Sequence, residues 1–257
     1  MIAHFALRLL CGISLMWCLM PRDKVTTGFY RIQMLVALGL SVLATLTTGH
    51  LLREGSDMVG MLSPAMARGI CIFLIMTAFA GSVGWTLGRR PFGNAVVFLF
   101  AGVSLITLLL VSYVQDESTG QTLLRAISEI STAMILGAAV TSMLLGHWYL
   151  TAPTMSVDPL HRLTLLFFLA AIFRLIISSV GLGFGFSAIE TQTHWTWLTL
   201  RWAAGIIGPL LLCAMVWRIL KYRNTQSATG VLFAGVILTF IGELSAALLD
   251  KELSLPL

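Results

Sequence analysis

Residues 124–184 read LRAISEISTAMILGAAVTSMLLGHWYLTAPTMSVDPLHRLTLLFFLAAIFRLIISSVGLGF, two long apolar stretches separated by a short polar segment between Thr151 and Pro159. An α-helix rises about 1.5 Å per residue, so about 20 apolar residues are needed to cross the roughly 30 Å core of a bilayer. Each stretch is long enough to cross, and the segment between them is short enough for a tight turn. This part of the sequence therefore predicts a transmembrane helical hairpin.

The composition extends this interpretation to the whole chain. Of the 257 residues, 58% are apolar and 11% are charged, whereas soluble domains are about 45–50% apolar and about 25% charged. One soluble core cannot bury so many apolar residues, so lipid is expected to surround the protein. The formal net charge is +5, but the basic residues occur in short loops between apolar stretches. That placement indicates membrane orientation and argues against a nucleic-acid partner.

The apolar stretches predict about eight spans. They cover residues 2–20, 30–52, 69–88, 92–114, 123–150, 160–184, 196–220 and 229–249. The expected fold is an all-α, polytopic integral membrane helix bundle with short loops, and residues 1–257 are expected to form a single transmembrane helical domain. An open sheet would leave backbone groups without hydrogen bonds in lipid, and the alternating pattern of a membrane β-barrel is absent. Asn224 or Thr225 is expected to cap the last span.

Basic residues concentrate in the first, third, fifth and seventh loops. They are Arg22, Lys24, Arg31, Arg89, Arg90, Arg162, Arg218, Lys221 and Arg223. The even loops balance basic residues against acidic ones or carry acidic residues alone. Because positive charge is retained on the cytoplasmic side of a membrane, the odd loops are predicted to face the cytoplasm. The protein is thus expected in a cell inner (cytoplasmic) membrane, with both termini on the outer side.

Four of the charged residues inside the predicted spans are the candidate catalytic residues. They are Glu129, Arg174, Arg201 and Glu243. An ionisable group in lipid is costly, so each is expected to face the interior of the bundle. Arg174 lies near the middle of the sixth span, where it could face an internal polar site or form a structural ion pair with a neighbouring helix. Glu243 is the expected partner of Arg201 or Arg174.

Histidines near the predicted ends of the spans are the candidate cofactor ligands. His50 could pair with His194, and His147 with His161, because b-type haem takes axial imidazoles from different helices. A quinone site needs an apolar slot, a hydrogen-bond donor and an acid, which the intramembrane His, Arg and Glu residues could supply. The first hypothesis is therefore a membrane subunit of an electron-transfer assembly that handles quinone or haem b. Its expected partners are membrane lipid and other membrane protein subunits.

Two further hypotheses stay open. The protein could be a small-anion carrier with Arg174 as the central counter-charge, or a membrane scaffold or assembly factor without a ligand. The scaffold hypothesis predicts that Arg174, Glu129 and Glu243 are all paired internally and that no cavity lies between the helices. The sequence contains no P-loop, dinucleotide-binding glycine pattern, HExxH motif or nucleophile elbow, and no zinc-ligand spacing, so no metal site is predicted. An enzymatic role would be at most that of a quinone-handling subunit of a membrane oxidoreductase.

Overall fold

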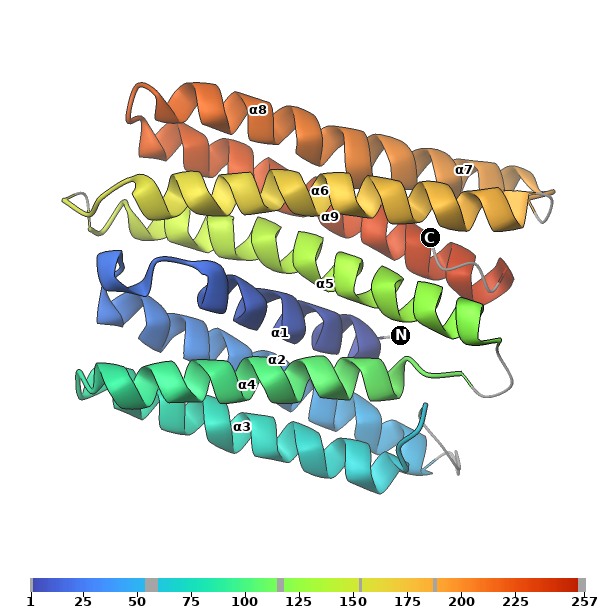
Figure 1. Cartoon of the computed structure of the whole chain (residues 1–257), viewed down its shortest axis with the longest axis horizontal. Coiled ribbons are helices and arrows are strands. Elements are labelled where there is room, and N and C mark those ends of the chain that lie inside the picture. The colour runs from blue at the N-terminus through green and yellow to red at the C-terminus, as the bar shows by residue number, and fades with distance from the viewer. Residues whose placement is uncertain (1, 54–59, 115–117, 153, 187–188, 254–257) are drawn as a thin grey trace. The chain divides into compact units, whose positions relative to one another are not determined.

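The computed structural model describes residues 2–53, 60–114, 118–152, 154–186 and 189–253, apart from the side chains of residues 49–53 and 184–185. Every regular element in these ranges is helical (Figure 1). The elements are α1 (Ile2–Leu19), the short 3₁₀-helix η1 (Arg22–Lys24), α2 (Thr27–Arg53), α3 (Pro64–Thr86), α4 (Arg90–Val111), α5 (Thr119–Trp148), α6 (Asp158–Gly185), α7 (Gln192–Trp202), the π-helix η3 (Ala203–Ile207), α8 (Gly208–Leu220) and α9 (Thr225–Leu253).

Within the described ranges, 8 helical stretches are long and apolar enough to cross a membrane. The seventh runs from Gln192 to Leu220 and joins α7, the π-helix and α8 into one continuous rod. The predicted fold class and number of spans are therefore confirmed. The side of the membrane on which the termini lie stays a prediction.

Local capping signals explain where α3 and α9 begin. The Ser63 hydroxyl accepts a hydrogen bond from the backbone N–H of Met66 at 3.3 Å, and Pro64 occupies the first turn of α3. Proline suits that position because its missing N–H would have no helical partner there. The helix therefore begins five residues before the predicted start at residue 69. The Asn224 side chain accepts from the backbone N–H of Ser227 at 3.0 Å, which confirms the expected cap of α9.

The connection between α5 and α6 is the predicted tight turn. Tyr149 is buried at its start, and its hydroxyl donates a hydrogen bond to the backbone carbonyl of Ser156. Burial raises the pKa of Tyr149 above its ordinary value. The hydroxyl therefore keeps its proton and can act as the donor that closes the hairpin.

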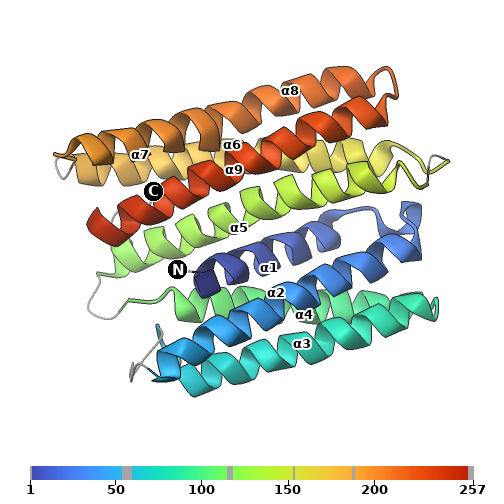
Figure 2. The ribbon, with the colours of Figure 1, turned by 180° about the vertical axis from the view of Figure 1, so that it is seen from behind.

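The chain divides into two compact units, Met1–Glu129 and Ile130–Leu257. In the first unit, α2 packs against α1 and α3, and α4 packs against the same two helices (Figure 2). Its core includes Leu10, Trp17, Tyr30, Leu74 and Phe100. Large apolar side chains such as Met76 and Phe79 are exposed along its spans. Such exposure is unfavourable in water but suits contact with acyl chains.

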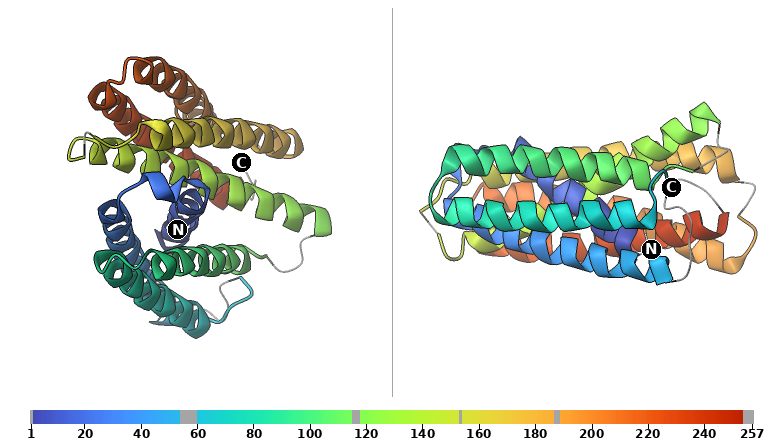
Figure 3. Two further views of the ribbon diagram at one scale, coloured as in Figure 1. Left: turned by 60° about the vertical axis from the view of Figure 1, so that its left-hand side comes forward. Right: turned by 90° about the horizontal axis from the view of Figure 1, so that it is seen from below.

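In the second unit, α9 packs along the rod formed by α7, the π-helix and α8, and α6 packs against α8 (Figure 3). Two glycines bring backbones together where α9 meets the π-helix. A Cβ atom added at Gly205 would lie only 2.8 Å from the Cα of Gly242. Small residues at such crossings allow the close helix approach that stabilises membrane bundles.

Candidate functional site

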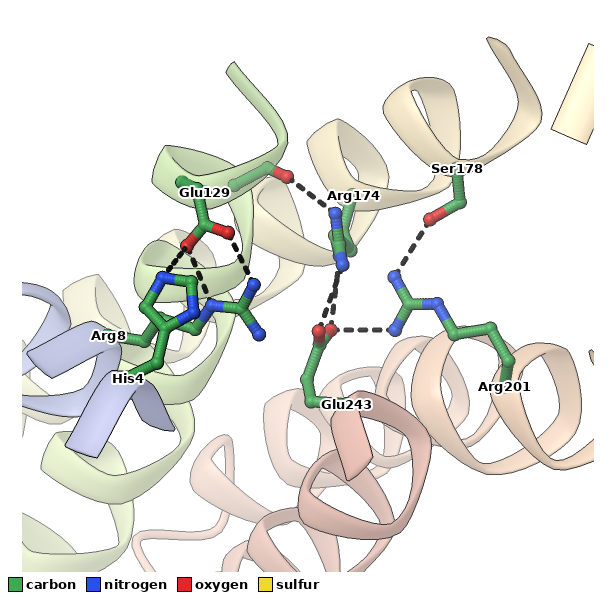
Figure 4. Close-up of polar contacts among 8 residues, drawn as sticks. His4, Arg8, Glu129, Arg174, Ser178, Arg201 and Glu243 are labelled. Carbon is green, nitrogen blue, oxygen red and sulfur yellow. Dashed lines mark hydrogen bonds and ion pairs between the residues drawn. The ribbon is translucent and has the colours of Figure 1, made fainter. Parts of the chain in front are cut away.

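The second unit contains a buried ion cluster centred on Glu243 of α9 (Figure 4). The carboxylate lies between Arg174 of α6 and Arg201 of α7. The exposed fractions of these side chains are 1% for Glu243, 2% for Arg174 and 0% for Arg201. The expectation that Glu243 pairs with Arg201 or Arg174 is therefore confirmed for both arginines.

Arg174 donates from all three of its guanidinium nitrogens. Nε lies 3.1 Å from Oε1 of Glu243, and Nη2 lies 3.0 Å from Oε2, so the pair is bidentate. Nη1 donates to the hydroxyl of Ser131 on α5 at 3.1 Å. Bidentate guanidinium–carboxylate pairs are among the stronger hydrogen-bonded contacts in proteins and also fix orientation.

Arg201 approaches Glu243 from the α7 side. Its Nη1 atom lies 2.7 Å from Oε1 of Glu243, and its Nη2 atom donates to Ser178 of α6 at 2.8 Å. Ser178 follows Arg174 by one helical turn. Each arginine therefore donates to a serine on another helix, Arg174 to Ser131 on α5 and Arg201 to Ser178 on α6. Together, the contacts of the cluster join α5, α6, α7 and α9 within the second unit.

The local sequence explains why Arg201 and Glu243 can meet. Gly242 directly precedes Glu243, and Gly205 lies one turn after Arg201, so the two backbones come close beside the ion pair. The π-helix Ala203–Ile207 begins two residues after Arg201. A π-turn is wider than an α-turn and is frequent at functional sites. It changes the angular register of α7 relative to α8.

The charges in this cluster are costly to bury. Removing an ion from water costs several kcal/mol even in real proteins, unless good geometry and further hydrogen bonds compensate. Both oxygens of Glu243 accept guanidinium N–H groups. Ser131 accepts a further N–H group from Arg174, and Ser178 accepts one from Arg201. The two arginines and one glutamate carry a formal charge of +1 together. The arrangement can therefore fix helices to one another. A guanidinium group can also bind an anionic acceptor such as a carboxylate or phosphate.

The first unit contains a second buried carboxylate, Glu129, in α5. It accepts from Nε of Arg8 at 2.7 Å and also from Nη2 of the same residue. Nε2 of His4, one turn earlier on α1, lies 3.2 Å from the carboxylate and 3.0 Å from the hydroxyl of Ser112. Glu129 is 4% exposed, so α1 and α5 are joined by another buried ion cluster.

The candidate histidines with described side chains differ in exposure. His194 is buried, and its Nε2 atom lies 3.0 Å from Oε2 of Glu252, a hydrogen-bond contact between α7 and α9. His147 is exposed near the end of α5, and His161 is partly buried in the first turn of α6. The His50 side chain lies outside the described residues. The haem hypothesis therefore stays a prediction.

Sequence reasoning found the carboxylates but missed several of their partners. His4 and Arg8 are four residues apart, which places them on one helix face. That spacing, with a buried acid on another predicted span, was the available signal for the Glu129 cluster. Ser131 carried no signal, because serine is common in membrane helices and its role depends on how α5 and α6 meet.

The chain matches no family model, no curated protein and no solved structure. Its function must therefore be inferred from the geometry of the clusters.

Proposed function

We propose that the protein is a non-catalytic membrane subunit that scaffolds or assembles other membrane proteins, and that its intramembrane charges hold its own helices in place. The observation that carries this proposal is the pairing of both buried carboxylates. Glu243 accepts from Arg174 and Arg201, and Glu129 accepts from Arg8 with His4 beside it. The scaffold hypothesis required this internal pairing of Arg174, Glu129 and Glu243.

The geometry of Arg174 favours this proposal over the small-anion carrier. A central counter-charge in a carrier has to present guanidinium N–H groups to the substrate. Each guanidinium nitrogen of Arg174 instead donates to Glu243 or Ser131. An anion would have to displace a bidentate carboxylate, and that exchange is unfavourable in a medium of low dielectric constant.

The partner of such a scaffold is expected to be another membrane protein. The described connections between spans are short, as in Leu87–Arg89 and Lys221–Asn224, and provide little surface for a soluble protein. The exposed faces of the spans are rich in large apolar side chains. Helix packing within the bilayer is therefore the expected mode of association.

Replacing the whole ion cluster by apolar residues tests this proposal. The variants are Glu243→Leu alone and the triple variant Arg174→Met, Arg201→Met and Glu243→Leu. A buried ion network replaced by apolar residues of similar volume often keeps or gains stability, whereas removing one partner is strongly destabilising. We expect the single variant to lose its native assembly on native gels of mildly solubilised membranes, and the triple variant to regain it.

A triple variant that folds with wild-type thermal stability but no longer enters its assembly would contradict the scaffold proposal. That result would mean that the charges themselves contact a ligand or partner.

The electron-transfer hypothesis has its own test in reduced-minus-oxidised spectra and lipid extracts of the purified protein. Haem bands or a bound quinone would support that hypothesis in place of the scaffold.

A further inference from the structure

One end of the first unit contains a group of buried polar atoms that have no hydrogen-bond partner among the described residues. They are Nε1 of Trp17, Nη1 of Arg22, the hydroxyl of Tyr30, Oε1 of Gln33, Nε1 of Trp85 and Oδ1 of Asn94. They come from the end of α1 and η1, the start of α2, the end of α3 and the start of α4. Figures 1 and 2 both show the α1–α2 and α3–α4 connections at this same end.

A ring contact joins two of these residues, and others join members of the group to neighbouring side chains. The Tyr30 and Trp85 rings are stacked with centroids 4.6 Å apart. Trp85 also lies against Gly93, next to Asn94, because a Cβ atom at Gly93 would meet the indole ring at 2.6 Å. The Arg22 guanidinium lies 4.4 Å above the ring of Phe98, one turn after Asn94 on α4.

Arg22 and Trp17 complete the group. Arg22 lies in η1, between the end of α1 and the start of α2. The Trp17 ring lies 6.0 Å from that of Phe100. We define the headgroup cluster as Trp17, Arg22, Tyr30, Gln33, Trp85 and Asn94.

Six buried polar atoms without a hydrogen-bond partner among the described residues point to a bound ligand. A buried donor or acceptor left unsatisfied costs the full desolvation of that group, and several together rival the net stability of a domain. Native proteins satisfy such groups with water, an ion or a ligand. The indole and guanidinium nitrogens are donors only, the tyrosine hydroxyl is both donor and acceptor, and the amide oxygens are acceptors. A ligand that satisfies all of these groups must therefore combine strong acceptor oxygens with hydrogen-bond donors.

The positive charge around the headgroup cluster favours an anionic ligand. The two connections and the first residues of α2 and α4 carry five basic residues, Arg22, Lys24, Arg31, Arg89 and Arg90, and one acidic residue, Asp23. Arg31, Arg89 and Arg90 are exposed. Basic pockets between membrane helices suit anionic lipid headgroups, and the sequence predicts that these loops face the cytoplasmic leaflet, where such lipids are enriched.

We propose that the headgroup cluster binds the headgroup of an anionic phospholipid that bears hydroxyl groups, of the phosphatidylglycerol type. The phosphate oxygens accept from Trp17, Trp85 and Arg22. The glycerol hydroxyls donate to Gln33 and Asn94, and Tyr30 bridges the two sets. This site is independent of the scaffold proposal, because none of its residues belongs to the ion clusters.

The test uses the full chain purified in a neutral detergent. Native mass spectrometry follows its titration with phosphatidylglycerol or with phosphatidylcholine of the same acyl length. We expect one retained phosphatidylglycerol with a dissociation constant at least about tenfold lower than that of phosphatidylcholine, the equivalent of about 1.4 kcal/mol. Equal affinity for the two lipids would overturn the proposal, since water or detergent would then satisfy the cluster.

Two variants locate the site. Trp85→Phe keeps an aromatic ring stacked on Tyr30 but removes the N–H donor, and Arg22→Gln removes the charge. Each is expected to weaken phosphatidylglycerol binding about tenfold, as the loss of a hydrogen bond to a charged group predicts. Trp217→Phe and Arg162→Gln, both exposed in the second unit, are the matched controls and should bind as the wild type does. Wild-type binding by Trp85→Phe would overturn the assignment.

Soluble competitors distinguish a lipid from free phosphate. Inorganic phosphate and glycerol 3-phosphate are added to the protein–lipid complex, and the retained lipid is measured. We expect neither to displace it at concentrations equal to that of the lipid, because the acyl chains add apolar contacts with the spans. Displacement by inorganic phosphate at equal concentration would contradict a lipid ligand. Thermal melting of each variant checks that lost binding is not lost folding.

Discussion

Glu243 shows how one residue in a lipid-exposed protein can fix three helices. The carboxylate accepts from Arg174 and Arg201, and each contact crosses from α9 to a different helix. Its charge is tolerated because opposite charges surround it in an environment that water does not reach. The residue therefore contributes to stability through its partners, and its removal leaves two guanidiniums without their carboxylate.

Glu243→Gln tests this interpretation at the scale of one side chain. Glutamine keeps the shape of glutamate but not its charge, so we expect the free energy of unfolding to fall by about 3–5 kcal/mol. Glu252→Gln is the control, because Glu252 is half exposed in its pair with His194. That change should cost no more than about 1 kcal/mol. Unfolding in mixed micelles measures both, and equal losses would argue against a special role for Glu243.

Sequence reasoning at the residue scale found which groups need partners but not all of the partners. A glutamate inside an apolar stretch has to face inward, so Glu243 and an arginine could be matched in advance. That both Arg174 and Arg201 reach it depends on the crossing of three helices, which hydropathy does not encode. Likewise, the contact between Glu129 and Arg8 depends on how α1 packs beside the start of α5.

The helical elements were largely predictable, because length and hydropathy determine a span. The exceptions have local physical causes. The start of α3 is set by Ser63 and Pro64, whose capping signal lies before the apolar stretch. The π-helix Ala203–Ile207 interrupts a span that the sequence presents as uniform. It contains Gly205, whose close approach to Gly242 is a property of tertiary packing.

Gly205→Ala is the matching test at the element scale. The added methyl group would overlap the Gly242 backbone and push α9 away from Arg201. Overpacking of this kind typically costs about 1–3 kcal/mol. Gly230→Ala, in α9, is the control because its Cβ atom would meet nothing within 4 Å. Equal thermal stability of the two variants would show that the close approach of the backbones contributes little.

At the scale of the whole molecule, the distribution of loop charges predicts the topology. Impermeant maleimide labelling of single introduced cysteines tests it in intact cells. Three of the native cysteines, Cys11, Cys71 and Cys213, are buried, so background labelling should be low. Glu190→Cys is expected to react from outside, and Tyr222→Cys only after the membrane is permeabilised, because positively charged loops stay in the cytoplasm. The reverse pattern would invert the predicted orientation.

The most direct measurement of the central claim, that buried carboxylates hold the helices together, is a double-mutant cycle between Arg201 and Glu243. The free energy of unfolding is measured for the wild type, Arg201→Met, Glu243→Leu and the double variant. Residues in one ion network couple by about 0.5–3 kcal/mol, so we predict that the double variant is more stable than the two single losses would imply. Losses that add to within about 0.5 kcal/mol would contradict the claim.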